Sequence, residues 1–295
     1  MTKPKGTLIA IGGNEKKNFA NLDERFQSDF GEGVILHDFN ELAGGTQSRI
    51  EVITSASAIP EEVGNKYRDT FRKLGVKNVG ILDIRDRKMA NSPETLKLIE
   101  EADAVLFSGG DQSKISKVFK DTKSHELLRH RYLNEKFVIA GTSAGAMVMS
   151  DEMIAGGRNG NVLKRNDLKM GKGLGLLSEA IIDSHFIRRA RFGRLAEAVA
   201  VHPEKLGIGL GEDTGIIITE GNVCEIIGSG MVIFFDGGGL EYNQSQNLKK
   251  HIPISLSNLC VHVLAPKDKY YIREKRVEIH YNPKNYRRTL TAEVD

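Results

Sequence analysis

The sequence predicts an α/β protein with a doubly wound, mostly parallel sheet and with antiparallel strands added in the C-terminal part. Three observations predict this fold class. Short apolar runs alternate with helical patterns up to about residue 150, glycine-rich turns follow several of these runs, and further short runs divided by glycine turns lie within residues 207–235. In such sheets the helices cover both faces, and ligands bind at the carboxyl ends of the strands.

The first half of the chain is expected to supply the parallel strands. They correspond to the apolar runs at 6–11, 49–54, 79–84, 104–107 and 137–142. Helices are expected at 22–30, at 60–74, from residue 92, at about 114–120 and at 126–134. In the second of these, Val63, Tyr67 and Phe71 recur at helical spacing, and Gly75 ends the pattern.

The second half changes character after residue 150. We expect a loop at 156–175, a short strand at 180–183 that leads to His185, and a helix at 186–201. The runs at 207–210, 216–219, 223–227 and 231–235 are expected to add antiparallel strands at one edge of the sheet, and 259–264 with 270–272 to form a last hairpin-like unit. A polar tail covers about 282–295. No repeat or linker is visible, so residues 1–295 are expected to form one domain.

The composition is that of an ordinary globular protein. Charged residues make up 27% and hydrophobic residues 40% of the 295 residues, and the net charge of +3 argues against bulk binding of nucleic acid. No apolar run has the length of a transmembrane helix, and the first residues lack a signal-peptide core, so we expect a cytoplasmic protein without a membrane partner. Cys224 and Cys260 lie in apolar runs and are expected to be free thiols.

The stretch around Ser143 carries the strongest functional signal. An apolar run leads to Ser143, with Gly141 two residues before it and Gly145 two residues after it, and a helical pattern follows. This is the G-x-S-x-G nucleophile elbow, in which small neighbours leave the serine clear on a tight strand-to-helix turn. Gly-x-Ser-x-Gly also occurs in structural turns, but this context favours a nucleophile.

A serine hydroxyl needs a base within hydrogen-bonding reach. Among eight histidines, His185 is the best placed, because it ends an apolar strand after Asp183 and Ser184. A core or capping histidine is the alternative. We expect Ser143 and His185, 42 positions apart, to meet at the rim of a single sheet.

Two further stretches have the chemistry to support such a site. Arg189, Arg191 and Arg194 follow the histidine, and their guanidinium groups suit substrate carboxylates; a solvated helix face is the alternative. The backbone N–H groups of Gly110 and Ala144 are candidates for an oxyanion hole.

Taken together, these motifs resemble cyanophycinase, a serine peptidase related to aspartyl dipeptidase with a fold similar to class I glutamine amidotransferases. The resemblance rests on 141–146, 109–112 and Asp183-Ser184-His185-Phe186 with the arginines that follow, and it also includes 43–45, 209–214 and 262–266. It implies hydrolysis of cyanophycin, or of related β-aspartyl peptides, to β-Asp-Arg dipeptides. The alternatives are an α-aspartyl dipeptidase and a non-catalytic peptide-binding homologue.

The resemblance also implies roles for particular residues. Ser143 would be the nucleophile and His185 the base, and the substrate would be bound by Gln112, Asp183, Ser184, Arg189, Arg191 and Arg194. It implies no metal or organic cofactor, and a homodimer.

Two positions depart from the family pattern. Ser184 stands where the family has glutamine, and Asn161 stands at the position of the triad glutamate. Asparagine can orient an imidazole but supplies no charge to stabilise imidazolium. Either Asn161 serves weakly, or a loop shift brings in Asp151, Glu152 or Asp167, or the enzyme is impaired.

Overall fold

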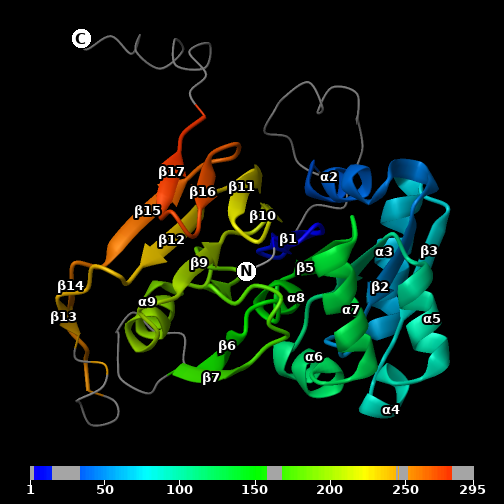
Figure 1. The fold of residues 1–295 in the computed structure, drawn as a ribbon, viewed down its shortest axis with the longest axis horizontal. Helices are drawn as coiled ribbons and strands as arrows, with labels where there is room; N and C mark the ends of the chain where they lie inside the picture. Colours follow the sequence, from blue (N-terminus) through cyan, green and yellow to red (C-terminus); the bar gives the residue numbers. More distant parts are fainter. Residues whose placement is uncertain (1–2, 15–33, 158–167, 244, 246–251, 281–295) are drawn as a thin grey trace.

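The structure is a computed structural model that describes residues 3–14, 34–157, 168–243, 245 and 252–280 (Figure 1). Within these residues the largest feature is a nine-stranded sheet with the strand order β17-β16-β11-β10-β1-β5-β4-β2-β3. The strands, in that order, are Arg276–Glu278, Lys269–Tyr271, Val223–Gly228, Thr214–Thr219, Thr7–Ile11, Val138–Thr142, Ala104–Phe107, Arg49–Ile53 and Asn78–Leu82.

The sheet has a parallel and an antiparallel part. Strands β1, β5, β4, β2 and β3 run parallel to one another, whereas β10 pairs with β1 antiparallel and is followed outward by β11, β16 and β17, also antiparallel. All five parallel strands expected from the sequence are present. The predicted fold class, mostly parallel with antiparallel strands added by the C-terminal part, is confirmed.

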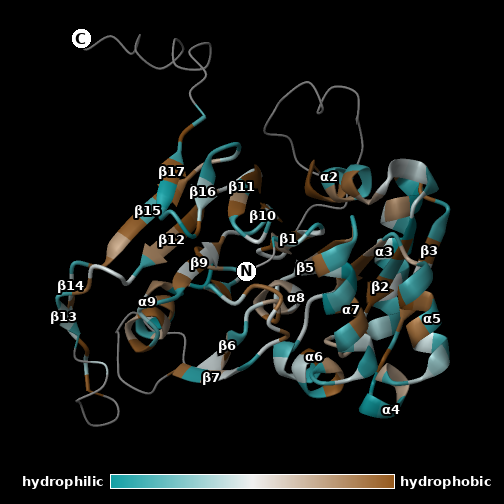
Figure 2. Cartoon of the chain, viewed as in Figure 1, coloured by the Kyte–Doolittle hydropathy of each residue, from teal (hydrophilic) through white to brown (hydrophobic). Residues whose placement is uncertain are grey.

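Helices cover both faces of this sheet. They are α2 (Val34–Ala43), α3 (Pro60–Lys73), α4 (Arg87–Ala90), α5 (Pro93–Glu101), α6 (Gln112–Phe119), α7 (Lys123–Asn134) and α8 (Ala144–Met147), with a 3-10 turn at Gly45–Gln47; α9 (Phe192–Val201) lies on a second sheet. Phe39 of α2 and Phe71 of α3 pack on one face with Ile9, whereas Phe119 of α6 packs on the other with Leu8. Figure 2 shows hydrophobic and hydrophilic colours alternating around α5, α6 and α7, as expected of helices with one buried face.

A second sheet corrects the expected placement of several strands. It has four strands in the order β15 (Cys260–Leu264), β12 (Val232–Asp236), β9 (Leu206–Leu210) and β8 (Ala180–Asp183), and α9 packs on it. The expectation that 207–210 and 231–235 extend the first sheet is therefore wrong. So is the final hairpin, because β15 pairs with β12 whereas β16 pairs with β11. Short apolar runs reveal strands but not their partners, which are distant in sequence.

Two local expectations are also wrong. The stretch at 156–175 contains the end of β6 (Glu152–Gly157) and β7 (Leu168–Lys172), which pair antiparallel. The helix expected from residue 186 begins only at Phe192, because the backbone turns first: Ala190 has a φ of 47°. A short pair, β13 (Tyr242–Asn243) with β14 (Leu256–Ser257), completes the strands described.

Some expectations lie outside the described residues. These are the helix at 22–30 and the tail at 282–295. That residues 1–295 form one domain stays a prediction. In the described part of the chain, no helix is long and apolar enough to cross a bilayer.

Candidate active site

Ser143 stands on a strained turn between β5 and α8. Its backbone has φ 50° and ψ −106°, a conformation that costs a residue with a side chain about 1–3 kcal/mol. The two flanking glycines are required because a side chain at either position would clash with the backbone. A Cβ on Gly141 would lie 2.3 Å from the backbone of Gly145, and one on Gly145 would lie 2.2 Å from the carbonyl oxygen of Phe107. The turn therefore has the geometry of a nucleophile elbow.

The end of β1 holds the elements of the site together. The carbonyl oxygen of Ile11 accepts a hydrogen bond from the N–H of Ser143, and the next carbonyl, that of Gly12, accepts one from the N–H of His185, both at 2.8 Å. Gly13 then accepts from the N–H of Asp213 at 3.0 Å. Three consecutive carbonyls thus fix three segments that are far apart in the chain.

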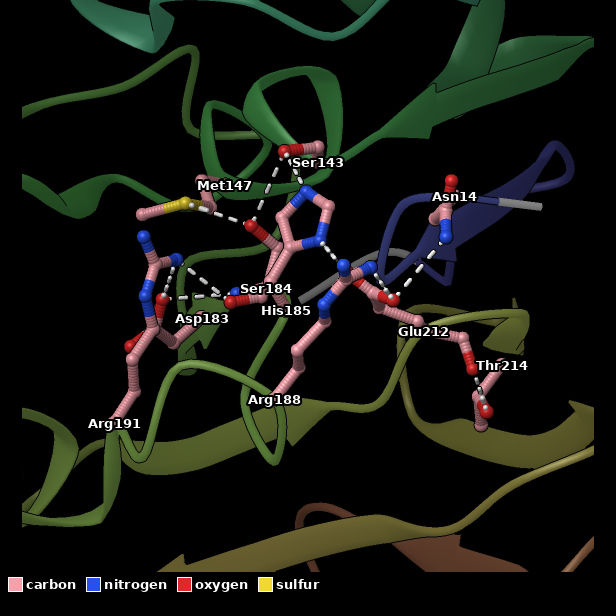
Figure 3. A network of polar contacts seen from close by, with 10 residues as sticks. All are labelled: Asn14, Ser143, Met147, Asp183, Ser184, His185, Arg188, Arg191, Glu212 and Thr214. Atoms are coloured by element: carbon pink, nitrogen blue, oxygen red, sulfur yellow. Dashed lines mark hydrogen bonds and ion pairs between the residues drawn. The ribbon is translucent and has the colours of Figure 1, made fainter.

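His185 lies beside the serine. Its Nε2 is 3.0 Å from Ser143 Oγ, and the two residues converge although Ser143 follows β5 of the large sheet and His185 follows β8 of the smaller one (Figure 3). The two side chains meet, as expected, but between two sheets rather than at the rim of one. Gly13 lies directly against the imidazole, since a Cβ there would be 2.6 Å from Nε2.

The other ring nitrogen of His185 faces Glu212, just beyond β9. His185 Nδ1 lies 2.7 Å from Glu212 Oε1, and the second carboxylate oxygen accepts from Arg188 Nη1 at 2.9 Å and from Asn14 Nδ2 at 3.2 Å. In Figure 3 the imidazole lies between the serine on one side and the carboxylate on the other. The side chains therefore form a hydroxyl–imidazole–carboxylate series, with Nδ1–H donating to Glu212 and Nε2 left to accept from Ser143.

The charges suit a general base. Burial lowers the pKa of His185, and although the hydrogen bond from its ring to Glu212 opposes this, the pKa stays below the usual value and leaves the imidazole neutral at pH 7. Burial acts to raise the pKa of Glu212, but hydrogen bonds from His185, Arg188 and Asn14 outweigh it and lower the pKa to about 2. The carboxylate is therefore charged when the imidazole takes up a proton.

Sequence reasoning missed Glu212. It placed Asn161 at the acid position, and Asn161 lies outside the described residues. Two of the suggested substitutes, Asp151 and Glu152, instead pair with Lys172, and Asp167 is also outside the described part. The available signal was a carboxylate directly after an apolar strand in a glycine-rich turn, at Gly211-Glu212.

A cavity of about 410 Å³ opens beside the serine. It is lined by Gly13, Asn14, Val63, Lys66, Tyr67, Gly109, Gly110, Thr142, Ser143, His185 and Arg189. The candidate oxyanion donor Gly110 is thus at the cavity. Ala144 is the first residue of α8, where N–H groups have no acceptor within the helix. Because α8 has only four residues, we attribute any oxyanion stabilisation to these individual N–H groups rather than to a macrodipole.

Only some of the expected substrate residues lie at the cavity. Arg189 lines the cavity, and Ser184 Oγ lies 3.4 Å from Ser143 Oγ and 3.3 Å from the sulfur of Met147. Gln112, by contrast, donates to the carbonyl of Ile154 at 2.7 Å.

The remaining three form a buried ion network. Asp183 is fully buried, and its carboxylate binds Arg191 Nη1 at 3.1 Å and Arg194 Nε at 2.6 Å. Arg191 also donates to the carbonyl of Ser184 at 2.7 Å, next to the histidine. These contacts hold the end of β8 in place, and none of the three residues lines the cavity. Their direct contact with substrate stays a prediction.

Comparison with known proteins agrees with this site. Residues 26–226 match the model of peptidase family S51. The chain is 37% identical over 280 residues to a cyanophycinase of Trichormus variabilis (strain ATCC 29413 / PCC 7937), covering 94% of this chain and 90% of the relative. It is 38% identical over 266 residues to a cyanophycinase of Geminocystis herdmanii (strain PCC 6308), covering 90% and 93%.

The fold comparison points the same way. A crystal structure of a peptidase from an acI-B1 Actinobacterium superposes with a TM-score of 0.60 at 18% identity, over 90% of this chain and 98% of the other. Fold and site thus define a serine hydrolase on a mostly parallel α/β scaffold. The chain belongs to peptidase family S51. The resemblance to cyanophycinase found in the sequence is confirmed.

Proposed function

We propose that this protein is a serine exopeptidase that hydrolyses cyanophycin, or related β-aspartyl peptides, to β-Asp-Arg dipeptides. The observation that carries the proposal is the uninterrupted series Ser143–His185–Glu212, with steps of 3.0 and 2.7 Å, in a chain similar to several cyanophycinases. The carboxylate on His185 also removes the argument for a homologue that lost its triad acid.

The proposed reaction has two halves. Ser143 Oγ attacks the substrate carbonyl while His185 Nε2 takes its proton, and Glu212 stabilises the imidazolium that forms. The N–H groups of Gly110 and Ala144 hold the oxyanion, and the imidazolium then protonates the leaving amine. Water, activated by the same imidazole, releases the acyl group from Ser143.

The proposed substrate fits the charge at the cavity. Each arginyl branch of cyanophycin ends in a carboxylate, and Arg189 lines the cavity beside the serine. A guanidinium group is a strong, geometrically selective partner for a carboxylate. We therefore assign Arg189 as the residue that binds this carboxylate, with Ser184 as a neighbour of the reacting centre.

The test is incubation of the purified protein with cyanophycin. Dipeptide release is expected from the wild type and from Ser178→Ala, a control that removes an exposed serine hydroxyl outside the cavity, and none from Ser143→Ala. Release that survives Ser143→Ala would contradict the nucleophile. Cleavage of α-aspartyl dipeptides without attack on cyanophycin would contradict the substrate, and binding without turnover of either would contradict the enzyme.

We also propose a homodimer located in the cytoplasm, with residues 1–295 folding as one domain. Support for the dimer comes from β15, an outer strand of the smaller sheet whose Val261 and Val263 are 39% and 57% exposed. Light scattering on the purified protein should give twice the chain mass, and a monomer would contradict the dimer. Denaturation should show a single unfolding transition, and two separate transitions would contradict the single domain. The compartment is testable by cell fractionation.

A further inference from the structure

A second cavity, of about 470 Å³, lies at the same edge of the large sheet. It is lined by Ser55, Arg85, Asp86, Arg87, Lys114, Lys117 and Val118, none of which lines the catalytic cavity. These residues follow β2, β3 and β4, so the cavity lies where α/β sheets bind ligands. In Figure 1 the helices that contribute to it, α4 and α6, lie side by side.

The two cavities are close neighbours with a wall between them. Ala56 follows Ser55 of the second cavity. A Cβ on Gly110 of the catalytic cavity would lie 2.1 Å from the carbonyl oxygen of Ala56. The N–H of Asp111 donates to the same carbonyl at 3.1 Å. This contact fixes the wall and separates the second cavity from the reacting serine.

The lining is rich in positive charge that acids do not neutralise. Arg87 donates to the backbone carbonyls of Lys120 and Asp121 at 2.6 and 3.1 Å, which hold its guanidinium in place without cancelling its charge. Lys114 and Lys117, one turn apart on α6, have no acidic partner among the described residues. Among the described residues, these three cations therefore line the cavity without an ion-pair partner.

The remaining charges do not reverse this balance. Arg85 is held by Asp83 at 2.5 Å and by the carbonyl of Ser57 at 2.9 Å. Asp86 is the one carboxylate among the lining residues, and its Oδ1 is engaged as the cap of α4, accepting from Met89 N at 2.8 Å. The cavity as a whole is therefore positive and attracts anions.

Ser55 supplies an independent sign of a ligand. It is 2% exposed, and its hydroxyl has no hydrogen-bond partner in the described part of the structure. Buried hydroxyl groups without a partner are uncommon in folded proteins, because leaving one unpaired is unfavourable. The oxygen is enclosed in this conformation, so rotation of the side chain about χ1 would be needed to present it to a ligand in the cavity.

We propose that this cavity is a second binding site, for a ligand that carries a phosphate or carboxylate group. The oxyanion would lie among Arg87, Lys114 and Lys117, with the hydroxyl of Ser55 as an additional donor. The guanidinium of Arg87 is already fixed, so this residue needs little ordering on binding. The volume is within the range of small-molecule sites, roughly 300–1,000 Å³. The site is independent of the proposed hydrolysis and does not require it.

The experiment is calorimetric titration of the full-length protein with inorganic phosphate at low salt. The variant Lys114→Gln/Lys117→Gln is compared with the control Lys123→Gln/Lys136→Gln, which removes two exposed lysines of equal charge on or next to α7. We expect saturable binding to the wild type and to the control, and an affinity lowered by about tenfold or more in the first variant. Absence of saturable binding, or equal losses in both variants, would overturn the proposal.

Two further measurements sharpen the result. Ser55→Ala should leave the melting temperature without phosphate unchanged, because its hydroxyl loses no protein partner, and should weaken phosphate binding. Ser143→Ala should bind phosphate like the wild type, and loss of binding in this variant would place the anion in the catalytic cavity and overturn a second site. With Ser143→Ala, displacement of phosphate by cyanophycin identifies carboxylates of the polymer as the ligand, and no displacement identifies a free anion.

Discussion

Replacement of Glu212 by glutamine tests the geometry of the site most directly. Glu212 Oε2 accepts two hydrogen bonds, from Arg188 and Asn14, whereas Oε1 faces His185 Nδ1 at 2.7 Å. In the variant the amide oxygen keeps the two donors, so the NH2 group is turned towards Nδ1. The histidine must then accept at Nδ1 and carry its proton on Nε2, the nitrogen that should take the proton of Ser143.

The expected effect is large, since both the tautomer and the charge are lost. Substitutions that impose the wrong tautomer in serine peptidases lower kcat by about 10⁴, so we expect a loss of roughly 10³ to 10⁴ here. That corresponds to about 4–5.5 kcal/mol of activation free energy. The side chain keeps its shape and two of its donors, so the melting temperature should change little.

The assay is dipeptide release from cyanophycin under single-turnover conditions, with circular dichroism to check folding. Asn161→Ala is the comparison variant and should retain activity close to the wild type. If Glu212→Gln keeps activity within about tenfold of the wild type, Glu212 does not set the histidine tautomer. If Asn161→Ala suffers the large loss instead, the acid position belongs to the 158–167 segment.

Three further predictions follow from the same geometry. Gly13→Ala should lower kcat by about 100-fold with the fold retained, because a Cβ 2.6 Å from His185 Nε2 displaces the imidazole; unchanged kinetics would contradict this contact. The catalytic form of His185 is neutral and its pKa is lowered, so kcat/KM should rise with pH through a midpoint below 6.5. Arg189→Ala removes a nearby positive charge that lowers the pKa of His185, so this midpoint should move upward. A downward shift would contradict this effect of Arg189. Asp183→Ala leaves Arg191 buried without its carboxylate and should lower the free energy of unfolding by about 3–5 kcal/mol in urea denaturation, whereas a loss in catalysis alone would show that the network serves the substrate rather than the fold.

Much of the fold could be predicted from local pattern. Each parallel strand is a short apolar run between helical patterns, and the helix starts carry local signals, such as the capping serine and the proline at Ser92-Pro93. What failed was the assignment of strands to sheets. Strand β9 pairs with β12 rather than with β10, the next strand in the chain, and β12 pairs with β15; no local pattern encodes these partners.

The sequence by itself pointed to the two proposed reacting groups. Ser143 is marked by the glycines that its turn requires, and His185 by its place after a buried strand, because both signals are local. Only the tertiary structure decided that Glu212, from a third segment, completes the series. The carbonyls of Gly12 and Gly13 at the end of β1 bind the segments of His185 and Asp213. These backbone contacts place the carboxylate of Glu212 beside His185, and the spacing of the two residues along the chain does not predict this.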